Sequence, residues 1–440
     1  MDQDFMKEKK VLPLVLTMSY PMAISMAVNA LYNIVDSFFV AQLDVKAMTA
    51  LSLLFPVQNL SHSAAVGFAI GINATVAFYL GQEKSEPADR AVSSGTLLSV
   101  IHGFILTAIC IAVMPWFLSM FTDDAAITNY GIEYSRYVFL FAPMDCMFLT
   151  CEKIFQATGR MKTTMFCLAA GCITNIILDP LMIFGIGPFP QLGIRGAAIA
   201  TGIGQSLPVL IYIALYVLRP LPVRFRIQYC RPELYMIKRL YSIGNAATLN
   251  LALPSVQISV LNAILSSFSS GYVFVLGVYY KLQTFLYLSA NGVVQGIRPL
   301  VGYNYGAGRN DRVREIVKIA TITVACIMLA GTAVCLLIPA RLMGIFTDDE
   351  AIISIGVSAI RIISAGFIIS SLPVILSGAL EGLGKGTASL MISLIRYIIV
   401  ILPLAFLLSR VSGACGVWHA FWLTEIVAAA VSYLIYRVTV

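Results

Sequence analysis

The chain has 440 residues, of which 59% are hydrophobic and only 12% are charged. Ordinary soluble domains carry about 25% charged residues. This composition excludes a soluble globular enzyme, a coiled coil and a disordered scaffold, because too few charges exist to solvate the surface. The chain is therefore predicted to be an all-α polytopic membrane protein. Its net charge of +7 needs no nucleic-acid partner, because a many-span protein concentrates Lys and Arg in its cytoplasmic loops.

Polar stretches divide the chain into twelve apolar segments, each long enough to cross a bilayer as a helix of about 20 residues. The segments run over residues 11–41, 47–80, 91–119, 130–157, 163–186, 194–218, 236–268, 272–303, 315–339, 352–382, 387–409 and 414–437. The first segment is too long for the apolar core of a signal peptide and lacks a small-residue cleavage site. It is expected to be a retained helix.

The two halves of the sequence repeat each other. The tetrapeptide Phe-Thr-Asp-Asp at residues 121–124 recurs at residues 346–349, so the numbering offset is 346 − 121 = 225. The same offset relates Gly67 to Gly292, Gly71 to Gly296, Gly81 to Gly306 and Gly159 to Gly384. Because each half contains six segments, an even number, both halves enter the membrane from the same side. The repeats are therefore predicted to be related by a pseudo-two-fold axis along the membrane normal.

The longest and most basic connection falls at the midpoint of the chain. It spans residues 219–239 and is interpreted as a cytoplasmic linker between a first lobe, residues 1–218, and a second lobe, residues 240–440. With the N-terminus inside, 19 of the 29 Lys and Arg residues lie in cytoplasmic loops and 6 in outer loops. Since basic residues are enriched on the cytoplasmic side, both termini are predicted to be cytoplasmic.

Acids within the apolar segments identify the candidate site. A charge near the middle of a bilayer costs about 2.5 to 3.5 kcal/mol on insertion scales and indicates a functional site by default. Asp36 lies in the first segment, three residues after Asn33 and on the same helical face. Asn175 and Asp179 are four residues apart in the fifth segment and also share a face. Two carboxylates and two amides suit a proton or a hard cation such as Na⁺.

Prolines lie close to these acids. Pro180 directly follows Asp179, and because proline lacks an N–H, the carbonyl of Ile176 loses its helical partner and becomes available as a ligand. Pro21 interrupts the first segment in the same way. Both helices are therefore expected to bend. Thr201 in the sixth segment adds a hydroxyl to the candidate site.

Two interpretations of the acids remain open from the residues alone. Asp36 and Asp179 either form one shared cation site or are separate structural residues near helix ends. Other embedded polar residues are candidates for a secondary polar path: Asn33, Gln205, Lys281, Gln295, Arg298, Arg396 and Glu425. Glu425 aligns with Gln205 when the numbering offset is 425 − 205 = 220, which makes it a candidate for a second proton-active group.

Two other kinds of site are not expected. The three histidines share no helical face and have no nearby carboxylate cluster, which argues against a zinc site. A glycine-rich stretch around Lys385 resembles a phosphate loop, but Ala379 stands where that motif requires its first glycine. Gly386 stands where it requires Ser or Thr. Without an ATP-binding module, transport is expected to draw on an ion gradient.

Three stretches are similar to a known family. Residues 292–307 read Gly-Val-Val-Gln-Gly-Ile-Arg-Pro-Leu-Val-Gly-Tyr-Asn-Tyr-Gly-Ala and resemble the eighth-helix signature of the multidrug and toxic compound extrusion (MATE) transporters. Residues 178–185 and 193–201 resemble the fifth and sixth helices of that family. The resemblance implies twelve helices in two six-helix lobes. It also implies export of mostly cationic, amphipathic compounds in exchange for Na⁺ or H⁺.

The resemblance also implies which residues hold the cation. In the DinF-like branch, the N-terminal lobe uses an Asp of the first helix, an Asn and an Asp of the fifth, and a Thr of the sixth. Asp36, Asn175, Asp179 and Thr201 match this set. The NorM-like branch also uses a Glu in the seventh helix, where residues 253–257 contain no acid. The chain therefore looks closer to the DinF-like branch.

The leading hypothesis is a cation-coupled multidrug exporter of the bacterial inner membrane, working as a monomer on small cationic or amphipathic drugs, with membrane lipid around it and without any cofactor. A flippase for lipid-linked precursors shares the general architecture and is the alternative. It would favour a basic cavity, and Lys281, Arg298 and Arg396 are the embedded basic residues available. An intramembrane enzyme would need a nucleophile paired with a base, or a metal pair, on facing helices. No such pair that includes a histidine is apparent in the sequence.

Overall fold

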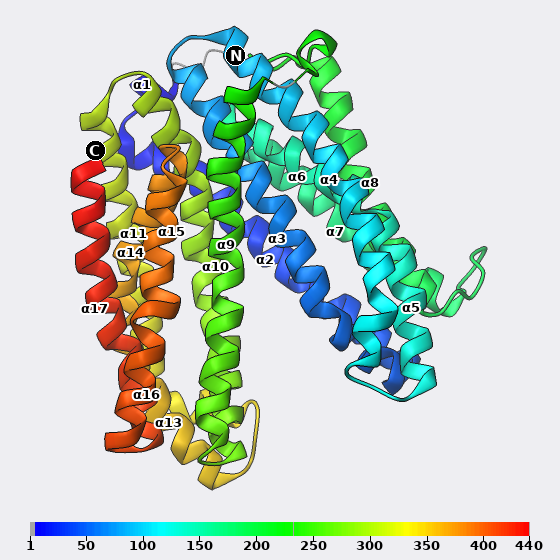
Figure 1. The fold of residues 1–440 in the computed structure, drawn as a ribbon, viewed down its shortest axis with the longest axis vertical. Coiled ribbons are helices and arrows are strands. Elements are labelled where there is room, and N and C mark those ends of the chain that lie inside the picture. The colour runs from blue at the N-terminus through cyan, green and yellow to red at the C-terminus, as the bar shows by residue number, and fades with distance from the viewer. Residues whose placement is uncertain (1–4, 232, 440) are drawn as a thin grey trace. The chain divides into compact units, whose positions relative to one another are not determined.

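The computed structural model describes residues 5–231 and 233–439. Within these ranges the chain consists of helices joined by short connections and contains no β-strand, which confirms the predicted all-α class. Figure 1 labels the helices and follows the chain from blue at the N-terminus to red at the C-terminus.

The helices up to the middle of the chain are α1 (Phe5–Glu8), α2 (Val11–Leu43), α3 (Val45–Gly81), α4 (Ser85–Ser119), α5 (Ala125–Leu140), α6 (Ala142–Ala157), α7 (Met161–Phe184), α8 (Ile194–Leu218) and the 3₁₀-helix η1 (Ile227–Tyr229). The later helices are α9 (Leu234–Ser266), α10 (Ser270–Gly306), α11 (Asn310–Leu337), α12 (Pro339–Gly344), α13 (Glu350–Ser364), α14 (Phe367–Gly382), α15 (Gly386–Leu394), the π-helix η2 (Ile395–Ile399), α16 (Ile401–Ser412) and α17 (Ala414–Thr439).

Each of the twelve predicted segments is occupied by one helix or by consecutive helices. Among the described residues, ten helical stretches are long and apolar enough to cross a membrane. The pair α13 and α14, bent by 54°, makes an eleventh. The remaining segment, predicted over residues 130–157, is divided into α5 and α6, which have 16 residues each. The chain is therefore a multi-pass membrane protein.

The break between α5 and α6 has an identifiable cause. Pro143 has no N–H, so the carbonyl of Phe139 lacks its partner four residues on. The hydroxyl of Thr107 on α4 donates to that carbonyl at 2.7 Å and replaces the missing bond. Gly103 lies one turn earlier on α4, and a Cβ there would lie 2.4 Å from the Cα of Pro143. The break is thus fixed against α4 by close backbone packing.

The chain forms two compact units, which we call the first unit and the second unit. The described part of the first unit is residues 24–231 and 233–248, and that of the second unit is residues 5–23 and 249–439. The boundaries fall within α2 and α9. The first half of α2 therefore packs with the second unit, and the first half of α9 packs with the first unit.

Repeated glycines make these exchanged half-helices fit. In the first unit, a Cβ at Gly71 on α3 would lie 2.5 Å from the Leu240 carbonyl oxygen of α9. In the second unit, a Cβ at Gly292 on α10 would lie 2.6 Å from the Cα of Ala23 on α2. A side chain at either position would clash with backbone. The repeated glycines found in the sequence are therefore contact points for the exchanged halves.

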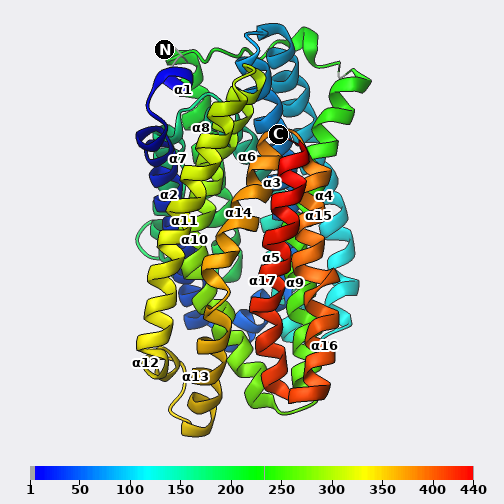
Figure 2. The ribbon, with the colours of Figure 1, turned by 90° about the vertical axis from the view of Figure 1, so that its left-hand side faces the viewer.

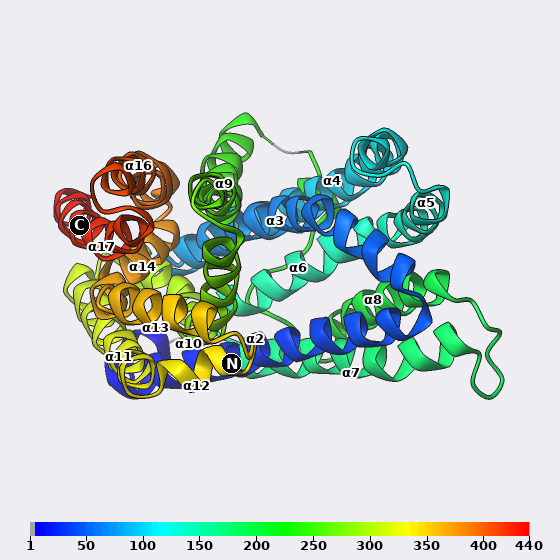
Figure 3. The same cartoon turned by 90° about the horizontal axis from the view of Figure 1, so that it is seen from below.

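Helices within each unit pack side by side. In the first unit α7 and α8 form a long hairpin, which Figure 3 shows along its length. In the second unit α14 packs between α11 and α17, and α16 packs on α17, as seen in Figure 2. One apolar cluster of the first unit joins α2, α3, α4, α5 and α7 through Val40, Leu54, Met114, Tyr134 and Ile183.

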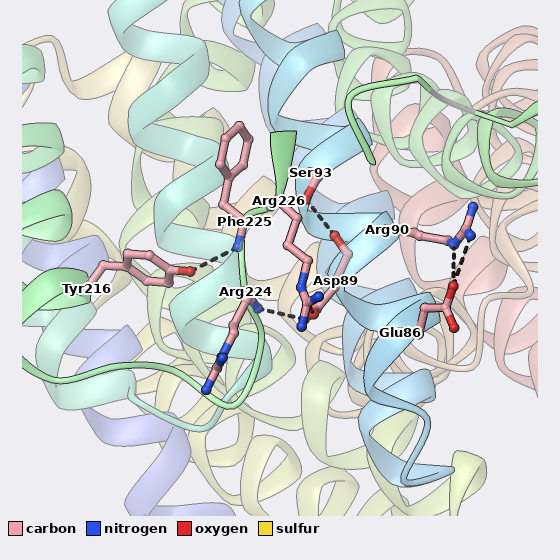
Figure 4. Close-up of polar contacts among 8 residues, drawn as sticks. All are labelled: Glu86, Asp89, Arg90, Ser93, Tyr216, Arg224, Phe225 and Arg226. Carbon is pink, nitrogen blue, oxygen red and sulfur yellow. Dashed lines mark hydrogen bonds and ion pairs between the residues drawn. The ribbon is translucent and has the colours of Figure 1, made fainter. Parts of the chain in front are cut away.

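The connection after α8 is held against α4 by polar contacts (Figure 4). The buried carboxylate of Asp89 accepts the backbone N–H of Arg224 at 2.6 Å and lies 3.3 Å from the guanidinium of Arg226. Ser93 accepts the backbone N–H of Arg226 at 2.9 Å. Residues 224–226 of this connection are thus held against the first unit. α9 then begins at Leu234, within the stretch assigned to the linker from the sequence.

Candidate functional site

Four of the residues identified from the sequence meet inside the first unit. The side-chain amide of Asn175 on α7 donates to Asp179 Oδ1 at 3.1 Å and to Thr201 Oγ1 of α8 at 3.4 Å. The carboxyl groups of Asp36 on α2 and Asp179 lie within hydrogen-bonding reach of each other. All four side chains are buried. We call this group the acid site.

The acid site has more acceptors than donors. Asp36 Oδ1, Asn175 Oδ1 and Asp179 Oδ2 are buried and have no hydrogen-bond partner among the described residues. Two buried carboxylates in contact cannot both stay ionised and unpaired, so a proton or a cation must lie between them. An all-oxygen set of this kind suits a proton or a hard cation such as Na⁺.

Two tyrosines that the sequence did not reveal face the acid site. The hydroxyl of Tyr32, one turn before Asp36 on α2, lies within hydrogen-bonding reach of Thr201. The hydroxyl of Tyr134 on α5 lies within reach of both Thr201 and Gln58 of α3. Tyr32 shares a helical face with Asp36, and this spacing was a signal that could have found it. No sequence pattern connects Tyr134 or Gln58 with the acids.

The two prolines lie inside continuous helices. Pro180 is within α7, directly after Asp179, and α7 runs on to Phe184. Pro21 is within α2, three residues before Ile24, where that helix passes from the second unit to the first.

The predicted secondary residues of the first unit lie apart from this cluster or at its edge. The side chain of Asn33 is exposed and donates to the carbonyl of Asn29 in its own helix at 2.7 Å. The structure does not bring it to the acid site. Gln205 lies one turn after Thr201 on α8 and is half-buried. The shared face of Asn33 and Asp36 seen in the sequence therefore does not produce a shared contact.

Arg298 and its neighbours form a polar contact within the second unit. The guanidinium of Arg298 on α10 lies 2.7 Å from Glu381 on α14, and both are buried. Asn250 on α9 donates to the same carboxylate at 2.8 Å. Gln295 lies one turn before Arg298 on the same helix. Lys281, also on α10, is exposed, with its ammonium 5.8 Å from the centre of the Phe346 ring.

Arg396 and Glu425 form a second buried pair in the second unit. Two nitrogens of Arg396 lie 2.7 and 2.8 Å from Glu425 Oε1, and two further bonds of 3.1 Å reach the hydroxyls of Tyr287 and Tyr397. Arg396 lies on the π-helix η2, a type of helix that often occurs at functional sites. Arg298 and Arg396 are thus both neutralised by glutamates.

The structure adds a histidine contact that the sequence did not predict. His62 Nδ1 on α3 lies 3.2 Å from Asp145 Oδ2 on α6, a single carboxylate rather than a cluster. The two residues are 83 positions apart, so proximity in the sequence could not reveal the pair. Within the described part of the chain, no group of three or more His, Cys, Asp or Glu residues is placed to hold a metal ion.

Comparisons with known proteins agree over nearly the whole chain. The MatE family model matches residues 21–181 and 247–407. Multidrug export protein MepA of Staphylococcus haemolyticus (strain JCSC1435) is 23% identical over 432 residues, which cover 98% of this chain and 94% of that protein. Multidrug export protein MepA of Staphylococcus aureus (strain NCTC 8325 / PS 47) is 25% identical over 439 residues, with the same coverage.

Solved structures share the fold. A crystal structure of MATE in complex with MaL6 superposes with a TM-score of 0.92 at 22% identity, covering 100% of this chain and 98% of that chain. An outward-facing conformation of a multidrug resistance MATE family transporter of the MOP superfamily also gives 0.92 at 22% identity, covering 99% and 97%. The predicted fold class, with two six-helix lobes, is therefore confirmed.

Proposed function

Because the chain belongs to the MATE family, we propose that it is a secondary active multidrug efflux transporter. It exports cationic amphipathic compounds by antiport with H⁺ or Na⁺, through alternating access of its two lobes. Relatives that align over nearly their full length are named multidrug export proteins, which supports this assignment.

The observation that carries the proposal is the acid site. Two carboxyls meet on helices α2 and α7, inside a chain of apolar spans, and three of the surrounding oxygens have no donor among the described residues. Such an arrangement is costly unless it binds something, because each embedded acid costs about 2.5 to 3.5 kcal/mol. The coupling ion offsets that cost when it binds.

Each residue of the acid site has a distinct role. Asp179 is fully buried and holds the proton or the cation, with Asp36 as the second carboxyl. Asn175 orients both Asp179 and Thr201 through its amide. Where Na⁺ is the coupling ion, Asp36, Asn175 and Asp179 hold it. By linkage, a drug whose affinity depends on the bound cation changes the cation affinity by the same factor.

The remaining features of the proposal follow from composition and resemblance. The protein lies in the bacterial inner membrane with both termini cytoplasmic, works as a monomer surrounded by lipid, and uses an ion gradient in place of ATP. It resembles the DinF-like branch more than the NorM-like branch, because the stretch 253–257 of α9 has no acid. The lipid-precursor flippase is less well supported, since two of the three embedded basic residues, Arg298 and Arg396, are paired with glutamates, and the third, Lys281, is exposed.

Efflux from inverted vesicles tests the proposal. Na⁺ and pH gradients are imposed separately, and transport of ethidium is followed by fluorescence. Asp36→Asn and Asp179→Asn are expected to abolish gradient-driven efflux, whereas Asp123→Asn, at an exposed acid in the loop before α5, leaves it intact. Full gradient-driven activity in either site variant would remove the acid site from the mechanism.

A further inference from the structure

His62 and Asp145 form a side-chain contact within the first unit. His62 lies close to the middle of α3, a long apolar helix that runs from Val45 to Gly81. Its imidazole is 3.2 Å from the carboxylate of Asp145 in the first turn of α6. The His62 side chain is 50% exposed and that of Asp145 is 15% exposed, so a ligand can reach both.

The repeat provides an internal comparison for this pair. The offset of 225 between the two halves relates His62 to Tyr287 and Asp145 to Ser370. In the second unit the Tyr287 hydroxyl and Ser370 Oγ are also in contact, at 2.6 Å. Both halves therefore join the same two helix positions by a polar contact. In the first unit that contact is formed by groups that can carry charge, which a purely structural contact does not require.

We propose that Asp145 is an anchoring site for an organic cation, and that protonated His62 is the counter-charge which the cation displaces. The Asp145 carboxylate is paired with the His62 imidazolium before binding. The cationic ligand takes the place of the imidazolium beside the carboxylate, and His62 releases its proton to water. One positive charge enters and one leaves, so the net charge of the site is unchanged. This inference rests on the proposed export function and adds to it a substrate contact.

The surroundings of His62 support this exchange. The charged groups that act on it from α6 are Asp145, Glu152 and Lys153. Glu152 and Lys153 are 3.3 Å apart and compensate each other, so Asp145 dominates. From α4, Cys110 lies within hydrogen-bonding reach of Ser61, the residue before His62.

Apolar groups lie beside the pair. Cys146 and Leu149 on α6 form a small cluster with Ala65 on α3, and Leu106 and Phe148 pack against it. A carboxylate next to apolar and aromatic groups fits an amphipathic cation better than a small metal ion.

Polar side chains also extend from the neighbourhood of the pair toward the acid site. Gln58 lies one turn before His62 on α3, and its amide is within hydrogen-bonding reach of the Tyr134 hydroxyl. Tyr134 in turn reaches Thr201 of the acid site. Polar side chains of one unit therefore lie between the pair and the acid site.

Binding of tetraphenylphosphonium to the purified full-length protein tests the inference. This probe has a permanent charge, so any pH dependence belongs to the protein. In the wild-type protein we expect affinity to rise by up to about tenfold per pH unit where His62 titrates, and then to level off. We also expect proton release on binding, measured with an indicator dye in weak buffer.

Three variants separate the possible causes. His62→Gln is expected to bind tightly at all pH values and to lose the proton release assigned to His62. Asp145→Asn is expected to bind at least about tenfold more weakly, as a lost charge-assisted contact predicts. Tyr287→Phe, at the equivalent position of the second unit, removes the contact with Ser370 and the hydrogen bond from Arg396, and is expected to keep the wild-type pH profile.

The outcomes distinguish this inference from the proposed coupling site. If His62→Gln keeps the full wild-type pH dependence and proton release, the displacement step is wrong. If Asp145→Asn binds with wild-type affinity, the anchoring site is wrong. Asp179→Asn should lose gradient-driven efflux but retain the His62-dependent pH profile of binding. Loss of that profile in Asp179→Asn would assign the released proton to the acid site, and would overturn the role of His62 while leaving the export function intact.

Discussion

The two units share a repeated scaffold and differ in how they treat buried charge. In the first unit Asp36 and Asp179 meet without a basic partner among the residues that the structure describes. The position of the second unit that matches Asp36, at 36 + 225 = 261, is the fully buried Leu261. The embedded acids of the second unit, Glu381 and Glu425, are each paired with an arginine.

This difference indicates which buried charges serve ligands. A carboxylate paired with arginine is already neutralised and has little to gain from a cation. A carboxylate facing another carboxylate changes its free energy strongly when a proton or a cation binds. The acids proposed to exchange a proton or a cation, Asp36 and Asp179, thus lie in the first unit, whereas Glu381 and Glu425 of the second unit are already paired with arginines, as Glu152 of the first unit is with Lys153.

The largest effect on efflux is expected when Asp36 of the first unit is replaced by leucine, the residue at the matching position of the second unit. Asp36→Leu removes one of the two carboxyls, so cation-driven efflux should fall to background. Stability should be maintained or raised, because a buried acid is replaced by an apolar side chain of similar size. Efflux in inverted vesicles and thermal unfolding in detergent check the two halves of this prediction. A variant that unfolds would show that Asp36 is structural.

Breaking an ion pair of the second unit should, in contrast, chiefly lower the stability of the protein. Glu425→Gln leaves the guanidinium of Arg396 buried without its carboxylate. The expected loss of stability is about 3 to 5 kcal/mol. The double variant Arg396→Met with Glu425→Leu should recover most of that loss, since a buried pair is often replaceable by apolar residues. Thermal unfolding of the three proteins measures this. Equal stability of Glu425→Gln and wild type would mean that Glu425 does not neutralise Arg396 as the structure indicates.

The fold was largely predictable because apolar length is a strong signal in a membrane. Every predicted segment contains helix. The division of the fourth segment was missed, although Pro143 marks its place in the sequence; the contact of Thr107 with a carbonyl 32 residues away, which replaces the missing helical bond, could not be predicted. The exchange of the first halves of α2 and α9 between the units was also not visible, since hydropathy says nothing about which helix packs on which.

The site was predictable only where a charge interrupts an apolar run. Asp36 and Asp179 are conspicuous for this reason. Asp145 was overlooked, although it lies near the middle of the segment predicted over residues 130–157. Its contact with His62 joins two helices, and a single sequence holds no pattern for such a contact.

A smaller effect is expected from the backbone beside Asp179. Pro180→Ala should restore the helical bond to the Ile176 carbonyl and stiffen α7 without removing a carboxyl. Drug affinity measured across pH and Na⁺ concentration gives the coupling factor, which is typically about 5- to 150-fold in coupled sites. We expect it to fall toward the lower end of that range. Identical coupling in wild type and variant would show that the proline is a packing feature.

The smallest effect compares the two repeated loops. Asp124 and Asp349 cap α5 and α13 by accepting two backbone N–H groups each. Asp124 also lies 2.7 Å from the ammonium of Lys46. The hydrogen bond from Lys46, and those from the first turn of α5, lower the pKa of Asp124. The stabilisation it provides is therefore present above the ordinary carboxyl pKa of about 3.9 and is lost as pH falls through the lowered value.

The expected difference is small, because both partners are solvent-exposed. Asp124→Asn should lower the melting temperature slightly at pH 7, and the difference from wild type should vanish once the pH has fallen through the lowered pKa of Asp124. Asp349→Asn serves as the matched control, since it changes the same cap without the contact to Lys46. We expect Asp124→Asn to have the larger effect at pH 7, and we expect the gap between the two variants to close in Lys46→Met protein. A gap that persists without Lys46 would assign the difference to the caps themselves.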